Sequence, residues 1–274
     1  RWAELGLASL LLVPAAWAIL AGAAHALYQP AAAWGWLAWL AVGVVHMRNL
    51  RQLATQLPGG ACSAAHVLGL WLLLLVPSLQ LRYLLMQLAE QYNAWRWLGW
   101  ALLPSLYLLW VARASRLPWP LASYPREYRL WAAAPLAGLL LVWFWLANAF
   151  SAGNADPLPY LPLLNPLELG LLLALSGAAL WAWQAGQAWN WPAALYRQGV
   201  QGVLGLSLFA LATAMVFRSA HHWGGVPFAQ PELLRSMLVQ AGLSLVWTSI
   251  ALGLMIAGHL RVRRQWWLLG GLLI

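Results

Sequence analysis

The chain has 274 residues, of which 63% are hydrophobic and only 8% are charged, and its formal net charge is +9. A soluble domain carries about 25% charged residues, so this composition excludes a soluble globular domain and a disordered segment. The 15 basic residues are all arginines scattered between apolar runs, which excludes a nucleic-acid-binding face. We therefore predict an all-α, polytopic transmembrane helical bundle.

Apolar stretches long enough to cross a membrane recur along the chain. We predict eight complete spans, over residues 4–27, 31–47, 63–87, 96–112, 131–150, 167–186, 200–220 and 236–259. A ninth span begins at residue 266 and is incomplete. Because the chain begins with Arg1 and ends within that apolar run, we expect a fragment of a longer chain. Many of the 22 tryptophans flank these stretches, as is typical of the membrane–water interface.

The arginines are distributed unevenly between the two ends of the predicted spans. The segments after the even-numbered spans, together with the N-terminus, carry Arg1, Arg48, Arg51, Arg113, Arg116, Arg126, Arg129, Arg197, Arg261, Arg263 and Arg264. The opposite ends carry Arg82, Arg96, Arg218 and Arg235. Since cytoplasmic loops hold the excess of positive charge, this pattern predicts a multi-pass protein whose N-terminus faces the cytoplasm.

The ends of the even-numbered spans resemble one another. Span two ends in the sequence His-Met-Arg-Asn-Leu-Arg at residues 46–51, and span eight in His-Leu-Arg-Val-Arg-Arg at residues 259–264. Span four ends with the same spacing of two arginines, and span six has glutamines in those places. We interpret this as one transmembrane domain built from four two-helix hairpins, roughly residues 1–55, 56–120, 121–195 and 196–265. Such repeats occur in transporters and in helical scaffolds.

The longest loop opposite the arginine-rich segments, residues 151–165, leads into span six. Asn165 suits the N-cap of that helix, Pro166 its first position, and Glu168 the acid of a capping box. The alternative is that Glu168 lies at a helix mouth beside a polar cavity. We expect Asp156, between Gly153 and a proline, to be a turn residue.

A second loop on that side follows two adjacent histidines. Gly224 and Gly225 are typical of a helix C-cap, and His221 and His222 suit the negative end of the helix dipole. Adjacent side chains on a helix diverge by about 100°, so this pair is a poor chelate for a single metal ion. We expect no metal and no cofactor.

Three segments in the second half of the chain carry a family resemblance: residues 160–169, residues 221–228 with the two histidines, and residues 238–247. In this order and spacing they resemble the C-terminal part of the domain of unknown function 2339 family, over roughly residues 155–274. Glu168 stands where the family pattern leads us to expect Asp. The resemblance implies a large multi-pass protein of the bacterial inner membrane and implies no catalytic residues.

Charged and titratable groups at the span ends opposite the arginine-rich segments are the candidates for substrate binding. They are Arg82, Glu168, Arg218, His221 and His222. Ionisable groups at this depth are costly unless they reach water or a partner. We expect Arg82 to extend outward to the membrane surface or to pair with Glu90 or Glu168. Arg218 lies about one helical turn before the histidines and should share a face with one of them.

Three functions remain open on this evidence. The first is a non-enzymatic transport or envelope-assembly component that handles a lipid-linked or small anionic substrate. The second is a membrane enzyme acting on a lipid-linked glycan or acyl donor, with Glu168 as general acid or base and His221 or His222 as its partner. The third is a structural scaffold for another membrane protein. The expected partners are membrane lipids and a protein partner or oligomer, and no nucleic acid.

Overall fold

The computed structural model describes residues 11–23, 29–53, 56, 58–88, 94–113, 118–186 and 192–273. Apart from one isolated bridge between Ala155 and Leu158, the regular elements in these ranges are helical, which confirms the all-α class. They are α2 (Leu12–Gly22), α3 (Gly35–Leu53), α4 (Gly59–Leu88), α5 (Ala94–Arg113), the π-helix η1 (Glu127–Ala132), α6 (Ala133–Phe150), α7 (Pro166–Ala185), α8 (Ala193–Gly224), α9 (Gln230–Arg235), α10 (Met237–Leu260) and α11 (Arg264–Leu273).

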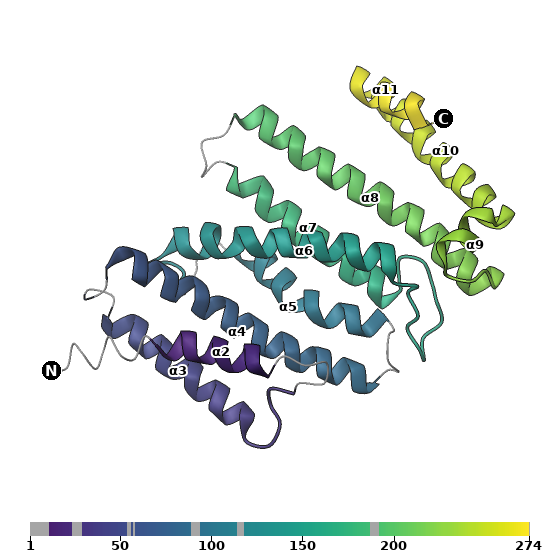
Figure 1. Ribbon diagram of the computed structural model, residues 1–274. Helices are drawn as coiled ribbons and strands as arrows, with labels where there is room; N and C mark the ends of the chain where they lie inside the picture. Colours follow the sequence, from purple (N-terminus) through teal and green to yellow (C-terminus); the bar gives the residue numbers. More distant parts are fainter. Residues whose placement is uncertain are drawn as a thin grey trace.

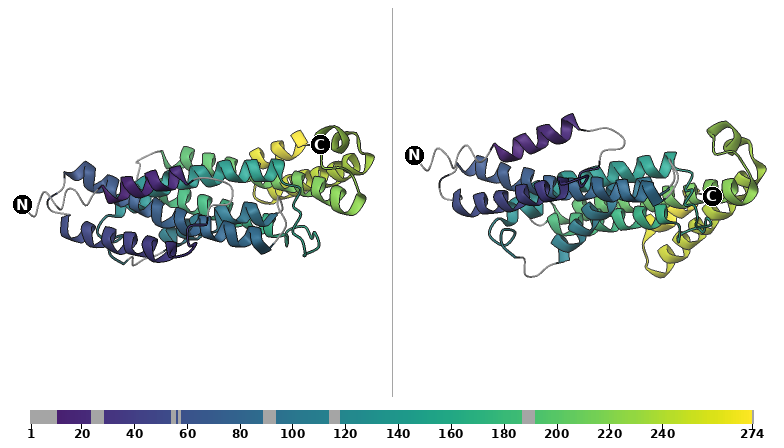
Figure 2. Two further views of the ribbon diagram at one scale, coloured as in Figure 1. Left: turned by 60° about the horizontal axis from the view of Figure 1, so that its bottom comes forward. Right: turned by 90° about the horizontal axis from the view of Figure 1, so that it is seen from below.

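The helices lie side by side in roughly the order of the chain. Figures 1 and 2 show α2 and α3 at one edge of the bundle and α10 and α11 at the other. Consecutive long helices run in opposite directions, so their ends form two sides. We call the side with residues 151–165 and 225–229 the loop side, and the side with the ends of α3, α5, α7 and α10 the arginine side.

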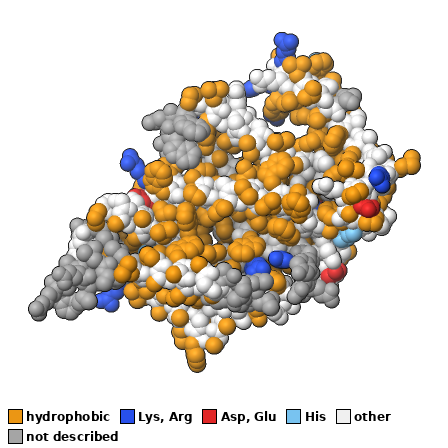
Figure 3. Space-filling model, in the orientation of Figure 1, with side chains coloured by type: hydrophobic (Ala, Val, Ile, Leu, Met, Phe, Trp, Pro, Cys, Tyr) orange, Lys and Arg blue, Asp and Glu red, His pale blue; other side chains and the backbone are white. Residues whose placement is uncertain are grey.

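Five of the described helices are long and apolar enough to cross a membrane: Gly59–Gln87, Glu127–Phe150, Pro166–Ala185, Ala193–Gly224 and Met237–Leu260. Apolar side chains cover most of the face seen in Figure 3, and charged side chains lie chiefly near its margins. The predicted count of eight spans is not confirmed. The polar last turns of α3 lower its mean hydropathy, and the tryptophans, tyrosine and arginines of α5 lower that of α5. Much of the predicted span at residues 4–27 lies outside the described residues.

The most extensive helix contact in the described ranges joins α5 to α7. A Cβ atom at Gly177 of α7 would lie 3.0 Å from the carbonyl oxygen of Ser105 and 3.5 Å from Cβ of Leu108. The absence of a side chain at this position lets the two backbones approach closely, as is common between membrane helices. The largest buried apolar cluster lies here, between α5, η1, α6 and α7.

Contacts between helices cross the boundaries of the predicted hairpins. Helix α5 belongs to the second predicted hairpin and packs mainly on α7 of the third. The incomplete ninth span forms α11, which folds back on α10 with Gly258 and Gly270 at the contact. A Cβ atom at either glycine would lie 2.6 Å from a backbone atom of the other helix. The hairpin repeat itself stays a prediction from the sequence.

Candidate functional site

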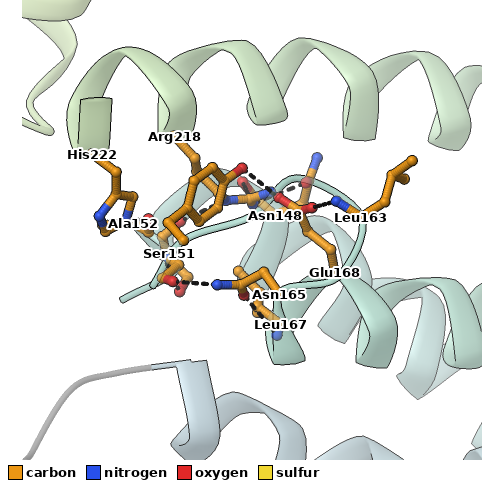
Figure 4. A network of polar contacts seen from close by, with 11 residues as sticks. Asn148, Ser151, Ala152, Leu163, Asn165, Leu167, Glu168, Arg218 and His222 are labelled. Carbon is orange, nitrogen blue, oxygen red and sulfur yellow. Dashed lines mark hydrogen bonds and ion pairs between the residues drawn. The ribbon is translucent and has the colours of Figure 1, made fainter. Parts of the chain in front are cut away.

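Glu168 and Arg218 form a buried ion pair near the loop side of the bundle (Figure 4). Nη1 of Arg218 lies 3.4 Å from Oε1 of Glu168, and both side chains have 0% exposure. Glu168 stands in the first turn of α7, and Arg218 stands in the second-last turn of α8. Two charges at this depth are stable only when they are paired and hydrogen-bonded on their remaining atoms.

The Arg218 guanidinium ties α8 to the end of α6. Its Nε donates to the carbonyl oxygen of Ser151 at 3.1 Å. Its Nη2 donates to the carbonyl oxygen of Asn148 at 2.8 Å and to the Asn148 side-chain oxygen at 3.0 Å. A guanidinium carries five donors in a planar fork, so one side chain satisfies two carbonyl groups at the end of α6, those of Asn148 and Ser151.

The Glu168 carboxylate accepts from two further donors. The Tyr160 hydroxyl donates to its Oε1 at 2.6 Å, and the backbone N–H of Leu163 donates to its Oε2. Glu168 therefore reaches back toward the preceding loop, and the capping-box prediction is wrong in its partner. The N–H of Asn165, which a capping box would use, donates instead to the carbonyl oxygen of Leu161 at 2.9 Å.

The other two predictions for this loop are confirmed. The Asn165 side-chain oxygen caps α7 by accepting from the N–H of Leu167 at 2.9 Å, with Pro166 at the first helical position. Its side-chain nitrogen also donates to the carbonyl oxygen of Gly153 at 2.7 Å. Asp156 lies in a turn that the N–H of Leu158 closes onto the carbonyl oxygen of Ala155 at 2.9 Å. Asn165 thus holds the loop to the helix that follows it.

The two histidines point to different parts of the loop side. The His222 ring shares the face of Arg218, as predicted, with its Nε2 2.8 Å from the carbonyl oxygen of Ala152. It stacks on the ring of Tyr160 with centroids 4.6 Å apart and an interplanar angle of 12°. The His221 Nδ1 lies 2.7 Å from the carbonyl oxygen of Val226, beyond Gly225, which has φ 68° and forms the predicted C-cap.

Arg82 does not join this network. The residue as a whole is 7% exposed, and its guanidinium carbon lies 5.3 Å from the ring centroid of Trp100 on α5. Arg82 is largely covered by the packing of α4 on α5, and its extension to the membrane surface stays a prediction. The predicted pairing with Glu168 is wrong, because Glu168 is paired with Arg218. The alternative partner, Glu90, lies outside the described residues.

The environment of the network keeps its phenol neutral. Burial of Tyr160, reinforced by its hydrogen bond to Glu168, raises the pKa of the phenol well above its ordinary value of about 10. Both oxygens of Glu168 accept from donors of the protein itself. This ion pair and its hydrogen bonds therefore hold α6, α7, α8 and the loop of residues 151–165 together. Within the described ranges, no three His, Cys, Asp or Glu side chains are placed to hold a metal ion.

A crevice of about 840 Å³ lies beside the network, between α6, α8, α9 and α10. Its walls are mostly apolar, and Asn148, Thr213 and Gln230 are among its polar lining residues. Asn148 belongs to both features, because its side-chain oxygen accepts from Arg218. Trp145 and Trp247 form part of the apolar wall. The crevice is of the size at which proteins bind small molecules, roughly 300–1,000 Å³.

Sequence reasoning missed the partners that complete the network. Asn148 and Ser151 fall at the end of a long apolar span, where a small polar residue carries no strong signal. It also missed a polar cluster on the arginine side in which His66 and Tyr128 are buried and Ser63 and Glu127 are partly buried. There Nδ1 of His66 lies 2.9 Å from the hydroxyl of Tyr128, and the hydroxyl of Ser63 donates to Glu127 at 2.7 Å.

Of the comparisons with known proteins, the comparison with protein-family profiles gives a match. Comparisons with curated proteins and with solved structures give no match. The profile of a family described as predicted membrane protein (DUF2339) matches residues 1–274. The match therefore extends the resemblance predicted over residues 155–274 to the first half of the chain. With five apolar helices of membrane-spanning length among its described residues and the loop motifs around Glu168 and His221, the chain belongs to this family of multi-pass membrane proteins.

Proposed function

We propose that this chain is a non-enzymatic membrane component that binds a lipid-linked substrate from the side of the bundle, for transport or for envelope assembly. The observation that carries the proposal is the 840 Å³ crevice between α6, α8, α9 and α10. Its apolar walls suit a hydrocarbon chain, and the polar groups of Asn148 and Gln230 suit the head that such a chain carries.

The ion pair positions the polar wall of this crevice. Arg218 binds both the carbonyl and the side-chain oxygen of Asn148, so it fixes the amide at the edge of the cavity. In this proposal the Asn148 amide, held in the wall of the crevice, is the polar group that meets an anionic or hydroxylated group entering beside it. In this proposal Arg218 and Glu168 act on the substrate through Asn148, and the direct substrate-binding role of the five sequence candidates stays a prediction.

The hydrogen bonds of the Glu168 carboxylate support the proposed substrate-binding protein over a membrane enzyme that uses Glu168 as a general acid or base. A general base needs an oxygen within hydrogen-bond reach of the proton that it abstracts. Here Oε1 accepts from Tyr160 and Arg218, and Oε2 accepts from the N–H of Leu163. The side chain has 0% exposure. A substrate would have to displace these donors before it reached the carboxylate.

The test measures binding of a radiolabelled long-chain polyprenyl phosphate to the purified full chain in phospholipid nanodiscs. Ala210→Trp fills the crevice from α8, and Gln230→Leu removes a polar group at its exposed end. We expect Ala210→Trp to weaken binding by about tenfold or more, because it excludes the hydrocarbon chain. Leu252→Trp, on an exposed face of α10, is the matched control and should bind as wild type. Unchanged binding by a folded Ala210→Trp protein would overturn the proposal.

A second candidate, a scaffold for another membrane protein, is favoured by the exposure of α10. Only 11% of its apolar window is buried inside the structure, although its mean hydropathy is 1.7. A Cβ atom at Gly253 meets no atom within 4 Å, so this face accepts a closely packed helix. Cross-linking from Gly253→Cys in native membranes tests it. Capture of a defined protein partner, together with wild-type lipid binding by Ala210→Trp, would favour the scaffold.

A further inference from the structure

A positively charged cavity of about 400 Å³ lies on the arginine side, between the ends of α5, η1 and α7. Arg126 and Arg129 line it together with Trp183 and Gln184. None of the described residues that line it is acidic. Glu127, the acidic residue between the two arginines, is turned toward α4, where its Oε1 accepts from the Ser63 hydroxyl. Among the described lining residues, the two arginines are the only charged groups.

The backbone that carries these arginines is fixed from three directions. Residues 127–132 form a π-helical turn, a rare conformation that is frequent at functional sites. Three side chains donate to its carbonyl oxygens: Tyr107 of α5 to Tyr128 at 2.8 Å, Trp181 of α7 to Arg129 at 2.7 Å, and Trp71 of α4 to Ala132 at 3.1 Å. Donors from three helices thus hold the backbone that carries Arg129 in place.

An apolar crevice of about 680 Å³ adjoins this cavity, and Trp181 lines both. It runs between the arginine-side halves of α6, α7 and α8, and small side chains such as Ala178 leave it open. A Cβ atom at Gly138, in its wall, meets no atom within 4 Å. Arg197 lies near the cationic cavity, since its guanidinium carbon is 5.5 Å from the ring centroid of Trp183, which lines that cavity.

We propose that the arginine-side cavity binds an anionic phospholipid, with its phosphate at Arg126 and Arg129 and an acyl chain in the crevice beyond Trp181. The charge of the cavity matches a phosphate, and bidentate arginines suit its oxygens. The apolar crevice that opens beside the cationic one matches the chain attached to that phosphate. Tryptophan at both cavities suits the depth of the head groups. This site is separate from the crevice on the loop side and does not depend on it.

Native mass spectrometry of the purified full chain tests the proposal with two probes, phosphatidylglycerol and phosphatidylcholine with identical acyl chains. We expect phosphatidylglycerol to bind more tightly. In Arg126→Gln/Arg129→Gln the preference should fall by about tenfold or more, since two cations are lost from the phosphate. Arg261→Gln/Arg264→Gln removes two arginines from the same side of the bundle, and it should keep the preference. Equal binding of the two lipids, or equal losses in both double variants, would overturn the proposal.

A second pair of variants distinguishes a lipid from a soluble phosphate. Gly138→Trp fills the apolar crevice and should weaken phosphatidylglycerol binding, whereas Gly253→Trp, on the open face of α10, should not. If glycerol 3-phosphate competes fully and Gly138→Trp binds as wild type, the occupant is a small soluble anion and the lipid proposal fails. Ala210→Trp, which blocks the loop-side crevice, should leave phosphatidylglycerol binding at the arginine-side cavity unchanged. The two proposals can therefore fail independently of one another.

Discussion

Replacing Arg218 with methionine should destabilise the protein severely. The change removes four polar contacts to Asn148, Ser151 and Glu168, while the methionine keeps much of the apolar volume. Removing one partner of a buried ion pair typically costs about 3–5 kcal/mol, because the other charge stays buried and unpaired. We therefore expect a loss of about 4 kcal/mol in the free energy of unfolding, roughly a thousandfold in the equilibrium constant.

Reversible unfolding in mixed micelles, followed by circular dichroism, measures this loss. The exposed Arg235→Met is the matched control on the loop side and should change stability by less than about 0.5 kcal/mol. Glu168→Gln completes a double-mutant cycle. The double variant should cost less than the sum of the single variants, because neither charge then remains buried alone. A loss below about 1 kcal/mol for Arg218→Met, or strict additivity in the cycle, would refute the reasoning.

Three further predictions concern α7 and the loop before it. Gly177→Leu should lower the free energy of unfolding by about 1–3 kcal/mol, because its Cβ meets the α5 backbone, whereas Gly202→Leu, with open space around it, should not. Asn165→Ala should cost about 1–2 kcal/mol through the lost cap, whereas Ser236→Ala, at an N-cap without a side-chain bond, should be nearly neutral in chemical denaturation. The raised pKa of Tyr160 contributes stability that is complete below the unfolded pKa of about 10 and is lost as the pH rises above it. In alkaline titrations of unfolding, Tyr160→Phe should therefore lose less stability above that pH than wild type does; equal losses would contradict this assignment.

Local signals in the sequence located the ends of several elements correctly. The Asn-Pro pair at residues 165–166 predicted the start of α7, and the glycines at 224–225 predicted the end of α8. Both signals depend on interactions within a few residues, so they can be recognised without the rest of the fold. The same reasoning gave Glu168 a local partner, the N–H of Asn165. The structure gives it Tyr160, Leu163 and Arg218 instead, because the long loop folds back over the helix start.

The π-helical turn at η1 has no comparable local signal. Its carbonyl groups are satisfied by Trp71, Tyr107 and Trp181, which come from three helices distant in the sequence. In the sequence these aromatic residues are indistinguishable from tryptophans and tyrosines at the membrane interface. The inward turn of Glu127 toward Ser63, which leaves the arginine-side cavity without an acidic group in its described wall, follows from the same packing.

Composition and the spacing of apolar runs by themselves determined that this protein is a helical membrane protein, because burial in hydrocarbon requires long apolar helices whatever their arrangement. They also limited its buried charges to a handful of residues. Only the tertiary structure decided that Arg218 pairs with Glu168, 50 residues away, and that Arg82 lies against Trp100 of α5. The reason is physical: the cost of burying a charge demands a partner, but the identity of that partner depends on which helices pack together.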